Sequence, residues 1–110
     1  MANQKEAEDK INQLQLVEQN MQSFGMQKQN IQMQLMEVES ALAELGKTDS
    51  AYKIIGNVMV AAKKGDLKKE LEEKQEMLNM RISSVEKQEE KLREKATKMQ
   101  SEVLASMKKK

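Results

Sequence analysis

The sequence of 110 residues contains no cysteine, no histidine and no proline, and its only aromatic residues are Phe24 and Tyr52. Without cysteine the chain has no disulfide and no thiol nucleophile, which is compatible with a reducing cytoplasm. Without histidine it lacks the side chain most often used as a general base. The sequence also lacks a glycine-rich phosphate loop and a metal-binding cluster. We therefore predict a protein that is not an enzyme and that needs no cofactor or metal.

The charges are numerous but balanced, with 19 basic and 18 acidic residues and a formal net charge of +1. This balance gives no overall field that would attract nucleic acid or an anionic membrane. Charged residues make up 34% of the chain and mean hydropathy is −0.80, so helices packed in pairs are favoured over a globular core. No apolar run approaches the roughly 20 residues of a spanning helix, and the N-terminus has no signal-peptide core. We expect a soluble, cytoplasmic protein.

Apolar residues recur at alternating intervals of four and three in the first half of the chain, which is the heptad pattern of a coiled-coil helix. The predicted seam positions are Val17, Met21, Phe24, Lys28, Ile31, Leu35, Val38, Leu42 and Leu45. Lys28 is the charged exception, and a lysine there can extend its ammonium group to water and help to fix the register. We predict one helix over residues 3–45, followed by Gly46 in the left-handed conformation.

A second heptad pattern follows Asp66, whose carboxylate can cap backbone N–H groups just before the apolar residues resume. Its predicted seam positions are Leu71, Gln75, Leu78, Ile82, Val85, Glu89, Leu92, Ala96, Met99 and Val103. The polar residues Gln75 and Glu89 weaken packing but restrict the permitted alignments. We predict a helix over residues 66–107 that pairs antiparallel with the first.

The segment between the helices, residues 52–60, reads YKIIGNVMV and has the composition of β-strands. Gly56 and Asn57 tolerate positive φ, as a two-residue hairpin turn requires. The predicted pairing places Ile55, Val58 and Val60 on one face and Tyr52, Ile54 and Met59 on the other. Both faces are mostly apolar, whereas an exposed hairpin usually has one polar face. We predict a hairpin over residues 51–63 that is covered by neighbouring chains or, alternatively, by its own helices.

Several apolar residues do not fit the seams. Methionines at outward heptad positions can contact apolar segments of varied sequence, or can pack against a neighbouring subunit; they are Met26, Met33, Met36, Met77 and Met80. Apolar residues also gather where the chain ends meet, and some of them should stay accessible: Ile11, Leu14, Leu16, Val17, Met99, Val103, Leu104 and Met107. The alternative is that this group consists of surplus apolar residues at fraying helix ends.

The order of long helix, single hairpin and long helix, with residues 52–60 at the turn, resembles a β-type prefoldin subunit over the whole chain. The Tyr52-Lys53 start of the strand, Gly56 in the turn and the aliphatic strand after it match that family's pattern. A single hairpin favours the β-type over the α-type, and the short length favours an archaeal form. The resemblance implies a mainly α fold in one domain, residues 1–110: a long antiparallel coiled coil whose β-hairpin joins an oligomeric β-barrel.

The same resemblance implies an ATP-independent holding chaperone that passes unfolded polypeptides to a group II chaperonin. It would assemble from two α-type and four β-type subunits and would bind clients at the ends of its coiled coils. The implied assembly residues are Tyr52, Ile54, Ile55, Gly56, Val58, Met59 and Val60. The implied client-binding residues are Ile11, Leu14, Leu16, Val17, Met99, Val103, Leu104 and Met107. The alternative function is a structural or tethering coiled coil that oligomerises through its helices.

Overall fold

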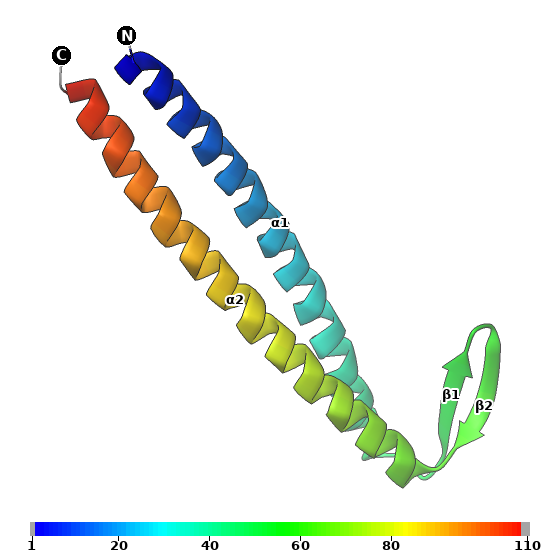
Figure 1. Ribbon diagram of the computed structural model, residues 1–110. Coiled ribbons are helices and arrows are strands. Elements are labelled where there is room, and N and C mark those ends of the chain that lie inside the picture. The colour runs from blue at the N-terminus through cyan, green and yellow to red at the C-terminus, as the bar shows by residue number, and fades with distance from the viewer. Residues whose placement is uncertain (1, 109–110) are drawn as a thin grey trace. The chain divides into compact units, whose positions relative to one another are not determined.

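The computed structural model describes residues 2–108, and Figure 1 shows the order of its elements. Helix α1 (Ala2–Leu45) is followed by strands β1 (Ala51–Ile55) and β2 (Val58–Ala62) and then by helix α2 (Lys64–Lys108). The strands form an antiparallel two-stranded sheet. Two long helices with a β-hairpin between them confirm the predicted fold class. The predicted domain also includes residues 1 and 109–110, which lie outside the described residues.

The chain divides into two compact units, which are described separately. The terminal unit combines α1 up to Lys28 with α2 from Ser84 onward. The hairpin unit is Gln29–Ser83, which holds the end of α1, both strands and the start of α2. In each unit the segments of α1 and α2 run side by side in opposite directions (Figure 1).

The terminal unit is held together by the predicted heptad seam. Val17 on α1 is buried, as are Val85 and Ala96 on α2. An ion pair joins Lys10 Nζ to Glu102 Oε2 at 3.4 Å and links the two helices in this antiparallel alignment. The seam predicted from spacing is therefore the packing surface of this unit.

A charged layer interrupts that seam at Lys28. Its Nζ atom lies 3.5 Å from Glu86 Oε1 and 3.7 Å from Glu89 Oε1. The Glu89 side chain is only 16% exposed, while that of Glu86 is 52% exposed. The predicted seam lysine thus meets a predicted seam glutamate, because α2 brings Glu89 to the same level of the helix pair.

The hairpin unit has the more continuous apolar core. Its buried residues are Ile31, Leu35, Val38, Leu45, Ala51 and Leu78. Leu78 of α2 has 0% exposure and is the most deeply buried of these side chains. Ala51 continues this core to the base of β1, where the hairpin meets the helices.

Two predicted details of the helix ends are wrong. Helix α2 begins at Lys64, two residues before the predicted cap, because the Leu67 N–H donates to the Lys63 carbonyl at 2.9 Å and closes the first turn. Asp66 lies within that turn, where its carboxylate interacts favourably with the helix dipole and stabilises the helix. Gly46 is not left-handed: its N–H donates to the Leu42 carbonyl at 3.2 Å in a right-handed continuation of α1.

Candidate interaction surfaces

The β-hairpin has the register predicted from its turn. Ile55 pairs with Val58 across the turn, and Ile54 pairs with Met59. Gly56 has φ +61°, and it is the only residue with positive φ in the part of the chain that the structure describes. Positive φ at the first central residue alone is the pattern of a type II′ turn, in which glycine is strongly preferred. Asn57 therefore does not need the unusual conformation that its sequence allows.

One face of the hairpin carries no charge. It consists of Tyr52, Ile54, Met59 and Ala61, because alternate residues of a strand point to the same side. Its three large side chains are 59–67% exposed. We call these four residues the neutral face. An exposed surface made only of uncharged and mostly apolar side chains is typical of a site that other protein covers.

The opposite face combines apolar residues with one lysine, and we call it the lysine face. Its members toward the turn are Lys53, Ile55, Val58 and Val60. Lys53 Nζ approaches Glu70 Oε1 of α2 to 2.7 Å. Ile55 and Val58 remain 59% and 60% exposed. The helices of this chain therefore leave both faces of the hairpin exposed, and the alternative of a hairpin covered by its own helices is wrong.

The predicted client-binding residues separate into three groups in the terminal unit. Ile11, Leu16, Leu104 and Met107 are exposed. Leu14, Met99 and Val103 are partly buried. Val17 is only 5% exposed, because it packs in the seam between the helices. The structure thus leaves Val17 unavailable to a client, and the accessible apolar surface consists mainly of the four exposed residues.

The outward methionines are exposed as their heptad positions predict. Met26 lies in the terminal unit, and Met33, Met36, Met77 and Met80 lie in the hairpin unit. Their exposed fractions range from 50% to 71%. Their role stays a prediction.

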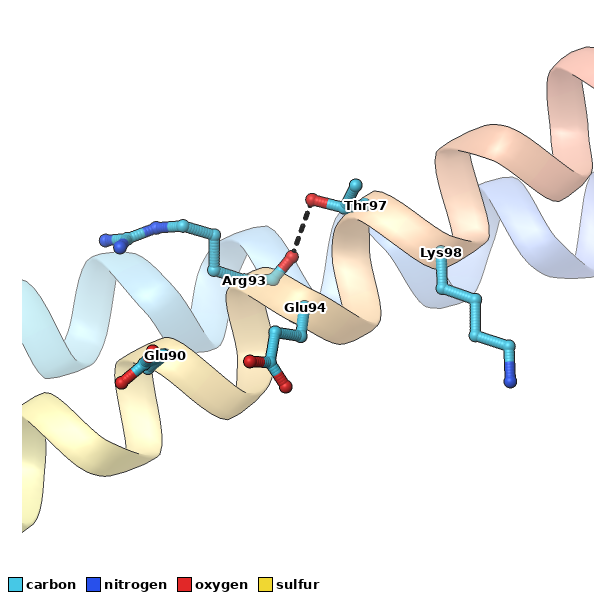
Figure 2. Close-up of a pocket in the computed structure, with 5 residues that line it drawn as sticks. All are labelled: Glu90, Arg93, Glu94, Thr97 and Lys98. Atoms are coloured by element: carbon cyan, nitrogen blue, oxygen red, sulfur yellow. Dashed lines mark hydrogen bonds between the residues drawn. The ribbon is translucent and has the colours of Figure 1, made fainter.

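A shallow surface pocket lies along α2 in the terminal unit, and Figure 2 shows its lining residues Glu90, Arg93, Glu94, Thr97 and Lys98. All five come from one helix. Thr97 Oγ1 donates to the Arg93 carbonyl oxygen at 2.9 Å, while the Arg93 and Lys98 side chains extend in different directions (Figure 2). Because these side chains do not converge, the pocket is a gap between solvated groups rather than a candidate ligand site.

Residues 2–108 provide neither a metal site nor a membrane-spanning helix. No group of acidic side chains there is arranged to hold a metal ion. Neither described helix is long and apolar enough to cross a bilayer. The hairpin faces and the exposed terminal residues therefore remain the candidate surfaces.

Comparison with known proteins agrees with this architecture. The family model described as "Prefoldin subunit" matches residues 8–110. The chain is 40% identical to prefoldin subunit beta of Archaeoglobus fulgidus over 96 residues, which cover 84% of this chain and 83% of that protein. It is 37% identical to prefoldin subunit beta of Methanospirillum hungatei over 99 residues, covering 87% and 82% of the two chains.

A solved structure gives the same result. The crystal structure of the prefoldin beta subunit from Thermococcus strain KS-1 superposes with a TM-score of 0.85 at 32% sequence identity. The match covers 92% of this chain and 91% of that chain. The similarity therefore extends over both helices and the hairpin, and this chain belongs to the prefoldin family, with β-type subunits among its relatives.

Proposed function

We propose that this chain is a subunit of an ATP-independent holding chaperone that assembles through its β-hairpin and captures unfolded polypeptides with its terminal unit. The observation that carries the proposal is the hairpin with two exposed, mostly apolar faces. An isolated two-stranded hairpin is marginally stable in water. Its unpaired strand edges also invite further strands. Both features favour burial of the hairpin between subunits.

The partners that fit are an α-type prefoldin subunit and further β-type copies. Closing several hairpins into a β-barrel pairs every strand edge and covers the apolar faces, so the joint stabilises each hairpin that enters it. Membership of the prefoldin family supports a complex of two α-type and four β-type subunits in the cytoplasm. The assembly residues are Tyr52, Ile54, Ile55, Gly56, Val58, Met59 and Val60.

Client binding follows from exposed apolar area in the terminal unit. Ile11, Leu16, Leu104 and Met107 offer surface for apolar segments, with Leu14, Met99 and Val103 at its margin. Burial of about 300 Å² of client surface at about 25 cal/mol per Å² yields about 7 kcal/mol before the entropy of association is subtracted. One subunit would therefore bind weakly. Several subunits acting together would hold a client by avidity while each contact still dissociates, so release needs no nucleotide.

Family membership also supports the last step, transfer of the client to a group II chaperonin. Weak, multivalent contacts suit such a transfer, because a second chaperone can displace them one at a time. The same contacts fit unfolded chains of varied sequence.

The experiment that tests assembly replaces Ile55 with Lys and Val58 with Glu in one variant. These residues pair directly across the turn, so opposite charges keep the hairpin stable while making its surface polar. Light scattering after size-exclusion chromatography measures the mass of each protein mixed with an α-type subunit. We expect the wild type to form the complex and the variant to lose it, with unchanged helical circular dichroism.

Met80→Glu is the matched control, because Met80 is 67% exposed but lies on α2. This variant should assemble like the wild type. If the Ile55→Lys, Val58→Glu variant assembles and Met80→Glu does not, the subunits associate through their helices, and the tethering function is supported instead.

A further inference from the structure

Methionine is the only sulfur-containing residue in this chain, since the sequence has ten methionines and no cysteine. Seven described methionines are at least half exposed in the subunit: Met26, Met33, Met36, Met59, Met77, Met80 and Met107. An exposed thioether reacts with peroxides to give a sulfoxide, which turns an apolar side chain into a polar one. The effect of that reaction depends on where each methionine lies.

Six of the seven lie on helices, and Met59 alone lies on a strand. It is 64% exposed and stands opposite Ile54 on the neutral face of the hairpin. The six helical methionines lie outside the strands, so their sulfoxides would stay out of the proposed contact between hairpins. Among the described residues, Met59 is the one exposed methionine on the surface that the proposed assembly buries.

We propose that Met59 is a peroxide-sensitive modification site that controls assembly: oxidation of its thioether in the free subunit prevents the hairpin from joining other subunits. This inference rests on the proposed function. The reagent class is a peroxide such as hydrogen peroxide. The thioether sulfur attacks one peroxide oxygen, the O–O bond breaks, and the other oxygen leaves as water with both protons. Sulfur loses two electrons and the peroxide gains them.

The neutral face offers few hydrogen-bond donors to the oxygen of a sulfoxide at Met59. A buried polar group destabilises an interface unless it finds a hydrogen-bond donor. The Tyr52 hydroxyl is the only side-chain donor among the four residues of this face, since the others are Ile54, Met59 and Ala61. Oxidation thus removes an apolar contact and adds an acceptor that must be desolvated.

Linkage makes the effect reciprocal. If a sulfoxide at Met59 weakens assembly, then assembly must disfavour its formation, and burial also blocks the approach of peroxide. Free subunits would be oxidised at Met59 while assembled subunits would be protected. Sulfoxide reductase restores the thioether, so the modification is reversible.

The experiment compares wild type, Met59→Leu and Met80→Leu. Leucine keeps the side chain apolar and of similar volume but cannot be oxidised in this way. Free subunits are treated with hydrogen peroxide, the peroxide is removed with catalase, and assembly with an α-type subunit is measured by light scattering. Peptide mass spectrometry measures the oxidised fraction of each methionine.

Relative to the same protein without peroxide, treatment should weaken assembly of the wild type and of Met80→Leu at least tenfold, whereas Met59→Leu should assemble equally well before and after treatment. Sulfoxide reductase with dithiothreitol should restore wild-type assembly. In the preformed complex, Met59 should oxidise at least fivefold more slowly than in the free subunit, while Met80 should oxidise at the same rate in both.

Equal sensitivity of Met59→Leu and wild type would overturn the inference, as would normal assembly of subunits whose Met59 is fully oxidised. Resistance of Met59 to peroxide in the free subunit would overturn it too. These results leave the proposed function intact. If the untreated wild type does not assemble, or if the Ile55→Lys, Val58→Glu variant does, the proposed function fails and this inference fails with it.

Discussion

Lys53 Nζ lies 2.7 Å from Glu70 Oε1, and this ion pair ties strand β1 to helix α2 within the hairpin unit. The two side chains are 40% and 53% exposed, so the pair contributes at most about 1 kcal/mol. Its importance is geometric, since it connects the lysine face of the hairpin to a helix. The pair should therefore limit how freely the hairpin opens.

Reversing either charge should loosen the hairpin, and reversing both should restore it. Lys53→Glu places two carboxylates together and Glu70→Lys places two ammonium groups together. We expect each single variant to raise hydrogen exchange of the amides of residues 51–62 about two- to fivefold at low salt, with the difference fading at 1 M salt. Exchange in the double variant that is as fast as in the faster single variant would contradict an orienting role for the pair.

The charged layer at Lys28 allows an asymmetric prediction. Lys28→Leu leaves the mostly buried Glu89 without its counter-charge, which should lower the free energy of unfolding by about 1–2 kcal/mol. Glu89→Leu should change stability by less than about 0.5 kcal/mol or raise it, because Lys28 keeps Glu86 as a partner. Urea unfolding followed by circular dichroism measures both variants. A larger loss in Glu89→Leu than in Lys28→Leu would show that Glu86 does not compensate.

Most of the fold could be predicted from the sequence because the spacing of its apolar residues changes twice, from helical to strand-like and back to helical. Spacings of three and four that place Ile31, Leu35 and Val38 on one seam have only one regular explanation, an amphipathic helix. Gly56 and Asn57 between aliphatic neighbours predict the turn and hence the register. These are local signals, and the structure confirms them.

Other features of the structure could not be predicted, because they depend on which hydrogen bonds form at the helix ends or on contacts between residues far apart in the sequence. The start of α2 and the conformation of Gly46 were predicted wrongly, because backbone hydrogen bonds close both helix ends without the expected caps. The Lys53–Glu70 pair joins residues 17 positions apart, and nothing in the spacing selects it. Val17 fits both the seam and the predicted client-binding group, and only the packing of α2 decides that it is buried.

The two glycines at Gly25 and Gly56 should respond to alanine in opposite ways. Gly25 lies inside α1, and an added Cβ would meet nothing within 4 Å, so Gly25→Ala should stabilise the chain by about 0.4–1 kcal/mol. Gly56 has φ +61°, so Gly56→Ala should strain the turn by about 1–3 kcal/mol although the space is open. Thermal unfolding measures the first variant and hydrogen exchange of the hairpin measures the second. Slower exchange of the hairpin in Gly56→Ala would contradict the turn assignment.

Polar substitution of Leu104 and Met107 should weaken client capture without affecting assembly. Both residues are exposed in the terminal unit, at 58% and 65%. Glutamine at both positions removes apolar area that a client would cover. This loss should weaken the free energy of client binding by about 1–2 kcal/mol for each side chain in each subunit. The measurement is the concentration of the complex that suppresses aggregation of a denatured protein. Because several subunits hold one client, we expect the variant to require at least a tenfold higher concentration than the wild type.

Met77→Gln with Met80→Gln is the matched control, because these residues are exposed to a similar degree, at 50% and 67%, but lie in the hairpin unit. Light scattering should give the same assembled mass for both variants and the wild type. If the control loses suppression and the Leu104, Met107 variant keeps it, clients bind at the outward methionines rather than at the chain ends. Equal loss in both would mean that apolar surface throughout the subunit contributes, because weak contacts add wherever an unfolded chain can reach them.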